Sequence, residues 1–234
     1  MSKIDTLQDF EKFMNGEIED CKDIQLYKGD PSTPDTLYDC LFTKVLFEQY
    51  KNDMIKTFQM QESDTLDELL KSSYDKIQLP KRSTSLSAGF DFFSPFEFTL
   101  KKGQTILIPT GIRCLIHPTK FLALVPRSGL GFKNRLQLAN TVGIIDADYA
   151  YADNEGHIMI KIVYEGFEEE TIENITINNI FVPCNFKQTT PESITIPEGK
   201  AFCQGIVIPY GIDEPILVQK KERKGGFGST DSSH

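Results

Sequence analysis

From about residue 75 onward, the chain is a succession of short runs of β-forming residues separated by turn residues. The runs are rich in Val, Ile, Phe and Thr, and Gly, Pro, Asn or Asp recurs about every ten residues between them. They are FDFFS, FEFTL, QTILIPT, IRCLIH, FLALVP, HIMIKIVYE, ITINNIFVP, SITIP, AFCQGIVIPYG and ILVQKK. Because sandwiches, barrels and jelly rolls alternate short strands with tight turns, this spacing predicts an all-β, jelly-roll-like domain.

The first part of the chain has a helical pattern instead. Residues 32–61 open with Thr33 as N-cap, Pro34 at the first helical position and Asp35 in the first turn. Apolar residues then recur three and four positions apart, which predicts one long amphipathic helix. Its apolar stripe consists of Leu37, Tyr38, Leu41, Phe42, Val45, Leu46, Tyr50 and Met54.

A second, shorter helix is predicted over residues 63–73, with Ser63 or Asp64 as its cap. The side chains expected to face inward are those of Leu66, Leu69 and Leu70. Together the two helices form an extension over residues 1–72, which packs on the main domain or on a partner protein.

The acidic charge of the chain is concentrated in this extension. The 234 residues carry a net charge of −9, and residues 1–72 alone hold 16 Asp or Glu against 8 Lys. Nucleic-acid binding needs a basic surface, so we expect no nucleic-acid partner. The nearly neutral remainder can still bind a small anion.

We expect neither a membrane-spanning segment nor a zinc site built from cysteine and histidine. No apolar run is long enough to cross a membrane, and the N-terminus lacks the basic start and apolar core of a signal peptide, which favours the cytoplasm. The five cysteines are scattered without C-x-x-C spacing, and three histidines give little material for a zinc site or a catalytic triad.

Two short segments contain side chains suited to phosphate chemistry. PRSGLG places a guanidinium, a hydroxyl and a glycine amide in succession at Arg127, Ser128 and Gly129, a compact anion site. GIIDADY places Asp146 and Asp148 around one alanine, and in an extended strand both carboxylates would share a face. Taken alone, each segment can equally be a turn or a polar strand end.

The C-terminal segment RKGGFGSTDSSH has two possible interpretations. Its glycines, hydroxyls and cations can form an anion-binding nest, whereas a Gly/Ser-rich chain end is by default a flexible tail. The neighbouring motifs favour the first reading. SAGFDFFS, PRSGLGFKNRLQLAN, TVGIIDADYA, GKAFCQGIVIP and this tail resemble, in order and spacing, the five motifs of the trimeric dUTPase (deoxyuridine triphosphatase) family.

The resemblance covers about residues 77–234 and implies a domain at 73–222 and a mobile arm at 223–234 that closes over nucleotide. It assigns phosphate contacts to Arg127, Ser128, Gly129 and Gln204, and uracil contacts to the hairpin with Asn140, Gly143 and Ile145. By the same resemblance Tyr149 lies under the deoxyribose, and Asp146 activates the attacking water. In the arm, Phe227 stacks on uracil while Arg223, Gly228, Ser229 and Thr230 close on the phosphates.

The implied reaction is hydrolysis of dUTP to dUMP and pyrophosphate, by attack on the α-phosphorus with Mg²⁺, in a homotrimer with shared sites. Asp91 matches an acidic residue near the metal and would act through water; a strand-end carboxylate bonded to the backbone is the alternative. Gln204 can likewise be a structural strand residue. A regulatory dUTPase-fold protein that binds a partner through its N-terminal extension, and a dCTP deaminase, are the alternative functions.

Several features depart from the family pattern. Ala201 follows Lys200 where an arginine is common in the fourth motif, and Asp231 replaces a common glycine in the tail. AYADNEGH lengthens the link after Tyr149, as in dUTPases of phages and Gram-positive bacteria. Residues 165–195 are also long enough to add a hairpin or flap.

Overall fold

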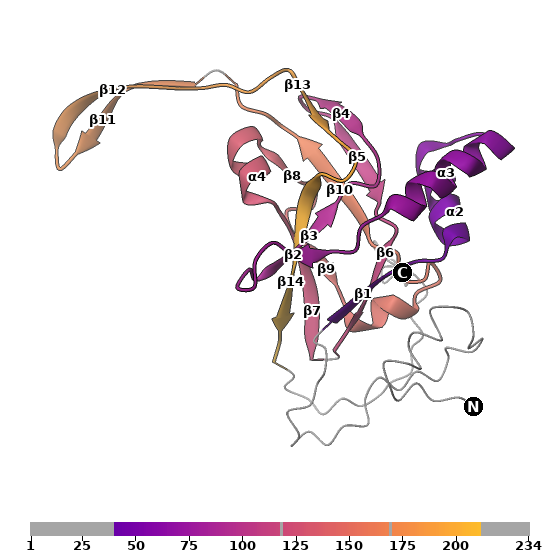
Figure 1. Cartoon of the computed structure of the whole chain (residues 1–234). Coiled ribbons are helices and arrows are strands. Elements are labelled where there is room, and N and C mark those ends of the chain that lie inside the picture. The colour runs from indigo at the N-terminus through magenta and orange to yellow at the C-terminus, as the bar shows by residue number, and fades with distance from the viewer. Residues whose placement is uncertain (1–39, 118, 169, 212–234) are drawn as a thin grey trace, which may run out of the picture. The chain divides into compact units, whose positions relative to one another are not determined.

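The computed structural model describes residues 40–117, 119–168 and 170–211 (Figure 1). These residues belong to a compact unit that begins at Cys40, and every strand pairing within them is antiparallel. The expectation of an all-β domain is therefore confirmed. The helix start at Thr33, the strand expected at ILVQKK and the arm at 223–234 lie outside the described residues.

The largest sheet has five strands in the order β2-β3-β14-β7-β9. Its strands are β2 (Lys81–Arg82), β3 (Gly89–Phe93), β14 (Ala201–Pro209), β7 (Lys120–Pro126) and β9 (Gly143–Ile145). β14 lies at the centre, where it pairs with both β3 and β7. The three family-like segments around Asp91, Arg127 and Gln204 are therefore neighbours in one sheet.

Three smaller sheets accompany the largest one, in addition to the β11-β12 hairpin at residues 170–188. One has the order β5-β10-β8, and two are the pairs β13-β4 and β1-β6. The strands are β1 (Cys40–Lys44), β4 (Phe98–Lys101), β5 (Thr105–Pro109), β6 (Ile112–Ile116), β8 (Leu136–Leu138), β10 (Met159–Tyr164) and β13 (Ser193–Ile196). Ile108 of β5, Leu122 of β7 and Ile160 of β10 are almost wholly buried in a shared core.

The predicted long helix over residues 32–61 is wrong at Cys40–Lys44, which form β1 and pair with β6. Phe42 packs its ring against Phe90 at 5.2 Å and Phe92 at 5.6 Å between ring centroids. Apolar residues three and four apart fit a helix, but here pairing and burial of aromatic side chains outweigh that local pattern. The periodicity of apolar residues within one segment does not reveal such contacts with distant parts of the chain.

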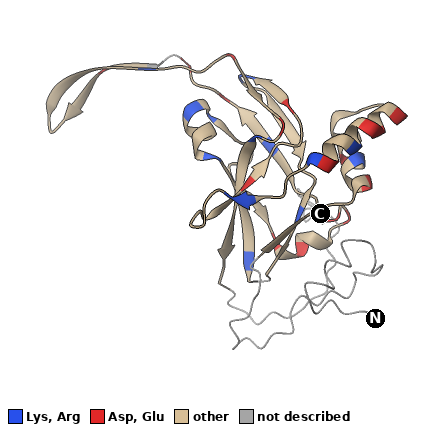
Figure 2. Ribbon diagram, viewed as in Figure 1, with Lys and Arg blue, Asp and Glu red and all other residues tan. Residues whose placement is uncertain are grey.

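Two helices follow β1, namely α2 (Phe47–Phe58) and α3 (Asp64–Lys76). The predicted cap of the second helix is confirmed, because the Ser63 hydroxyl accepts a hydrogen bond from the backbone N–H of Leu66 at 3.2 Å. Leu70 is buried as expected, whereas Leu69 is 64% exposed, so its inward placement is wrong. Figure 2 shows several Asp and Glu positions on these two helices, with Lys positions among them.

The helices cover the turn between β5 and β6. The backbone N–H of Val45 donates to the Gly111 carbonyl at 3.0 Å, and the Tyr74 hydroxyl donates to the Val45 carbonyl at 2.6 Å. Gly111 has a φ of +72°, and a Cβ there would collide with Ile77. In the part of the chain that the structure describes, no helix has the length and apolarity needed to span a bilayer.

The expected hairpin within residues 165–195 is confirmed as β11 (Glu170–Ile177) and β12 (Ile180–Gln188). The run ITINNIFVP is therefore two strands, because Asn178 and Asn179 have positive φ values of 49° and 63° and make the turn. Figure 1 shows this hairpin extending away from the sheets. One of its faces is apolar, since Ile177 pairs with Ile180 and Ile175 with Val182.

Candidate active site

A cavity of about 570 Å³ lies between the three-stranded sheet and strands β7 and β9. Its walls are mainly apolar, with backbone groups and a few polar side chains at the edge. They are Leu107, Leu124, Leu138, Ala139, Asn140, Gly143, Ile144, Ile145, Tyr149, Met159, Ile160 and Lys161. All four residues that the sequence assigns to the base and sugar, Asn140, Gly143, Ile145 and Tyr149, thus line one cavity.

The segment between β8 and β9 shapes this cavity by crossing from one sheet to the other. β8 pairs with β10, whereas β9 pairs with β7. Along the crossing, the Thr141 N–H donates to the Leu138 carbonyl at 3.0 Å and the Val142 N–H donates to the Asn140 carbonyl at 2.7 Å. These local hydrogen bonds fix the backbone that forms one wall.

Gly143 permits the close approach of β9 to β7. It stands opposite Leu124, and a Cβ at this position would lie 3.2 Å from the Leu124 Cβ. That separation is shorter than ordinary van der Waals contact, so a side chain would push the wall away from β7 or into the cavity. The close packing of β9 against β7 therefore favours glycine at position 143.

Tyr149 is held as a rigid part of the cavity wall. Its side chain is only 4% exposed, and its hydroxyl donates to the His157 carbonyl at 2.9 Å. The same hydroxyl accepts a hydrogen bond from the Asn154 side-chain N–H at 3.1 Å. Both partners come from the long link after the tyrosine, so this departure from the family pattern provides the support for the ring.

Asp146 follows the last cavity residue of β9 and is exposed. It is the N-cap of a short 3-10 helix, η1 (Ala147–Tyr151), and Asp148 lies in the first turn of that helix. The expectation that both carboxylates share the face of a strand is therefore wrong, because β9 ends at Ile145. In sequence, Asp146 follows the cavity residue Ile145, and Asp148 precedes the cavity residue Tyr149.

A second polar group lies in the five-stranded sheet. The Arg127 Nε lies 3.2 Å from Asp91 Oδ1, and the Ser83 hydroxyl donates to Asp91 Oδ2 at 2.6 Å. Gln204 stands opposite Asp91 in the pairing of β14 with β3, and its Nε2 donates to the Pro126 carbonyl at 3.4 Å. Ser83, Asp91 and Gln204 thus link three further segments to the Pro126–Arg127 segment, and Asp91 contacts the guanidinium.

Ser128 and Gly129 begin the helix α4 (Ser128–Asn134) beside this group. Both are exposed, and a Cβ on Gly129 would meet no heavy atom within 4 Å. The protein's own packing therefore does not require glycine at this position. Figure 2 colours positions on α4 and β2 as Lys or Arg, and Lys81, Arg82 and Lys133 are exposed, so this end of the sheet presents positive charge.

Within one chain, Asp146 lies far from Arg127. The register of β7 with β9 places Leu122 opposite Ile145, so Asp146 continues toward Phe121. Arg127 lies six residues further along the chain, directly after β7, which corresponds to about 20 Å at the usual rise of a strand. The structure therefore brings together the base and sugar residues, and separately the phosphate residues, with Asp146 at the end of the cavity wall away from Arg127.

The described residues contain no group of three or more His, Cys, Asp or Glu side chains that could hold a metal ion. Asp91 has partners on both carboxylate oxygens, namely Arg127 and Ser83. Magnesium keeps several waters and is commonly held through substrate phosphates. The donor set thus suits a metal that arrives with a triphosphate and contacts Asp91 at most through water.

Several residues of the site were not identified from the sequence. Ser83 completes the partners of Asp91, while Asn154 and His157 hold Tyr149. Lys161 and Met159 of β10 line the cavity from the far sheet. No local motif marks them, because their role depends on strand pairing across the two sheets.

Comparison with known proteins identifies the family of the chain. The dUTPase family model matches residues 75–179. The deoxyuridine 5'-triphosphate nucleotidohydrolase of Lactococcus lactis is 33% identical over 156 residues, which is 66% of this chain and 88% of the relative. That of Acinetobacter baumannii strain ATCC 17978 is 38% identical over 159 residues, which is 65% of this chain and 87% of the relative.

The fold and the relatives define a nucleotide-hydrolase class of β protein. The chain belongs to the dUTPase family. Among crystal structures, dUTPase from Streptococcus mutans is similar with a TM-score of 0.43 and 28% identity, over 58% of this chain and 89% of that chain. The dUTPase from phage phi11 of S. aureus has a TM-score of 0.43 and 23% identity, over 62% of this chain and 91% of that chain.

Proposed function

We propose that this chain hydrolyses dUTP to dUMP and pyrophosphate. The observation that carries the proposal is that Asn140, Gly143, Ile145 and Tyr149 line one cavity, and that Asp146 directly follows its wall. The nucleotidohydrolase activity named for the relatives supports the same conclusion. Family membership and local geometry therefore point to one reaction.

The cavity suits a pyrimidine base held by a rigid backbone. The crossing segment at residues 139–145 offers amide donors and acceptors, and Asn140 adds its side-chain amide. Cytosine would leave buried polar groups unpaired, which is costly, and a 5-methyl group would collide with a tight wall. The ring of Tyr149, packed beneath the sugar, would leave no room for a 2′-hydroxyl.

Asp146 is the proposed general base. An exposed carboxylate at the edge of the cavity can accept a proton from a water molecule as that water attacks the α-phosphorus. The oxygen that bridges the α- and β-phosphorus atoms then leaves with the pyrophosphate. Mg²⁺ bound to the triphosphate would neutralise part of the charge on the leaving group.

Arg127, Ser128, Gly129 and Gln204 are the proposed phosphate contacts. Asp91 holds the Arg127 guanidinium through an ion pair, and the fixed donor needs little reorganisation when charge develops on the phosphates. The open space at Gly129 allows a phosphate oxygen to approach the backbone closely. Gln204 is oriented by the Pro126 carbonyl.

The separation of the two groups supports a homotrimer with shared sites. With uracil against residues 140–143 and the α-phosphate beside Asp146, the triphosphate extends away from the chain's own Arg127. A second copy would then supply the phosphate contacts, and the arm at residues 223–234 would close over the nucleotide through Arg223, Phe227, Gly228, Ser229 and Thr230. A cytoplasmic location completes the proposal.

The test is pyrophosphate release by the purified protein with Mg²⁺ and, in turn, dUTP, dCTP, dTTP and UTP. We expect turnover with dUTP alone at physiological concentration. Release of ammonia from dCTP would show a deaminase instead. Binding of dUTP without hydrolysis would leave the fold assignment intact and replace the enzyme by a nucleotide-dependent regulatory protein.

A further inference from the structure

Helix α2 reaches the candidate active site through a buried histidine. His157 has no exposed surface; its Nδ1 lies 2.6 Å from Oδ2 of Asp53, and its Nε2 accepts a hydrogen bond from the Gly111 N–H at 2.7 Å. A backbone N–H can only donate, so Nε2 is an acceptor and Nδ1 carries the proton. The neutral ring therefore donates to the Asp53 carboxylate.

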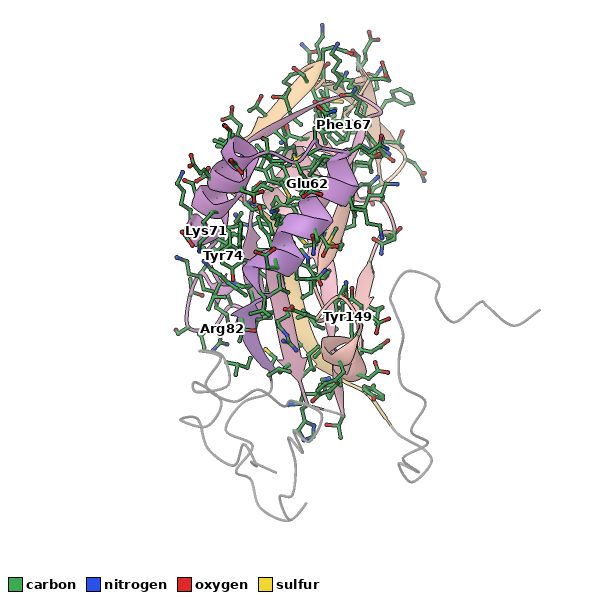
Figure 3. All side chains as sticks on the ribbon, turned by 90° about the vertical axis from the view of Figure 1, so that its right-hand side faces the viewer. Glu62, Lys71, Tyr74, Arg82, Tyr149 and Phe167 are labelled. Carbon is green, nitrogen blue, oxygen red and sulfur yellow. The ribbon has the colours of Figure 1, made fainter. Side chains whose placement is uncertain are left out.

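The same histidine holds Tyr149 through its backbone. The His157 carbonyl accepts the Tyr149 hydroxyl at 2.9 Å and the Asn154 side-chain N–H at 3.3 Å. Figure 3 labels Tyr149 on the short helix η1, which lies below α2 and α3 in that view. His157 thus connects α2 to the cavity: its ring is hydrogen-bonded to Asp53, and its backbone carbonyl is hydrogen-bonded to Tyr149.

Further contacts hold the same loop against α2. The backbone N–H of Leu46, the N-cap of α2, donates to the Glu155 carboxylate at 2.8 Å. Gln49 donates to Asp53 at 2.8 Å, and the ring of Tyr50 lies 6.3 Å from that of His157 between centroids. The helix and the loop at residues 152–158 are therefore joined at several points.

We propose that Asp53 is a positioning residue for substrate discrimination: through His157 it holds Tyr149 against the deoxyribose and so excludes ribonucleotides. This inference rests on the proposed dUTP hydrolysis. Asp53 lies outside residues 75–179, the part that matches the family, so a segment added before the family domain would tune its selectivity. Loss of the carboxylate would leave a buried N–H unpaired and release the loop that supports Tyr149.

The experiment measures kcat/KM for dUTP and for UTP with the wild type, Asp53→Ala and Asp53→Asn. The ratio of the two constants does not depend on the fraction of folded enzyme, so a loss of stability alone would not change it. For Asp53→Ala we expect the dUTP:UTP ratio to fall roughly tenfold, because small displacements of a positioning group change rates strongly. Asp53→Asn keeps an acceptor for His157 and should stay within about twofold of wild type.

Asn52→Ala is the matched control, because Asn52 is the exposed neighbour on the same helix. Should Asp53→Ala fail to fold, Asn154→Ala removes the other support of the Tyr149 hydroxyl and should lower the ratio in the same direction. An unchanged ratio in the folded variants overturns the inference while dUTP hydrolysis stands. A wild type that hydrolyses no dUTP overturns both.

Discussion

The two polar regions of this domain are built in opposite ways. The base and sugar cavity is enclosed by two sheets, and its Tyr149 is 4% exposed with two hydrogen-bond partners. The phosphate region is open, with Ser128 and Gly129 exposed at the start of α4. The enclosed region suits recognition of one fixed shape, whereas the open region suits a charged group that several chain segments surround only when it is bound.

The distance between Asp146 and Arg127 is the reason for proposing a shared site. Arg127 lies six residues beyond the position on β7 that Asp146 approaches, which is about 20 Å at the usual strand rise. Chemistry at the α-phosphorus requires a base and phosphate donors at the same atom. Under the proposed function, selectivity would therefore be a property of one chain, and turnover would be a property of the assembly.

The largest effect is expected at the edge of the enclosed region. Asp146→Asn removes the proposed general base but keeps the size of the side chain, so kcat should fall about 10²- to 10⁴-fold. Binding of dUMP, measured by calorimetry, should change little. Equal losses of binding and turnover would assign Asp146 to ground-state binding instead.

A smaller effect is expected in the open region. Arg127→Ala removes a charge-assisted donor, and kcat/KM for dUTP should fall roughly 10²-fold. Although its activity falls, the variant should keep the wild-type preference among dUTP, dCTP and dTTP. Arg135→Ala is the control, because Arg135 flanks the other end of α4 and is paired with Glu165. A changed base preference in Arg127→Ala would contradict the separation of roles.

Mixing the two variants tests whether the regions act across chains. Asp146→Asn chains keep an intact phosphate region, and Arg127→Ala chains keep an intact cavity. In randomly mixed assemblies, about a quarter of the sites should be complete if a neighbouring copy supplies the phosphate contacts. Refolding the two variants together and measuring pyrophosphate release gives the answer; no recovery above either variant alone would place both regions of a working site in one chain.

The smallest effect is expected in the pH dependence of the free energy of unfolding, through Asp53, which supports the enclosed region. Burial alone would raise the pKa of Asp53, but hydrogen bonds from His157 and Gln49 outweigh it and leave the pKa below its usual value of 3.8. Asp53 therefore adds stability that is present above that value and is lost as the pH falls through the lower pKa of the folded state. Urea titrations from pH 6 to pH 3 should show a shallower loss for Asp53→Asn; parallel curves would mean that the pair contributes nothing.

The sequence predicted the β class and the wall of the cavity because both depend on local patterns. Turn residues delimit most strands, and the motif from Asn140 to Tyr149 is nearly continuous in sequence. The Ser63 cap was predictable for the same reason. Local chemistry determines these features, and it is visible in a few consecutive letters.

The features that were missed depend on distant partners. Cys40–Lys44 form a strand because β6 is available for pairing, which no periodicity within residues 32–61 reveals. Asp146 and Asp148 do not share a strand, because β9 ends at Ile145 and a 3-10 helix begins at Ala147. Asp53 and His157 are 104 positions apart, so their hydrogen bond follows from the fold and not from spacing.

A crystal structure of the protein with Mg²⁺ and α,β-imido-dUTP, which resists hydrolysis, would show directly which chains contact the base and the phosphates. We expect uracil in the 570 Å³ cavity of one copy, the α-phosphate beside Asp146 of that copy, and the phosphates in contact with Arg127 of another copy. Phosphates bound by Arg127 of the same chain that holds the base, or a base outside the cavity, would contradict this expectation.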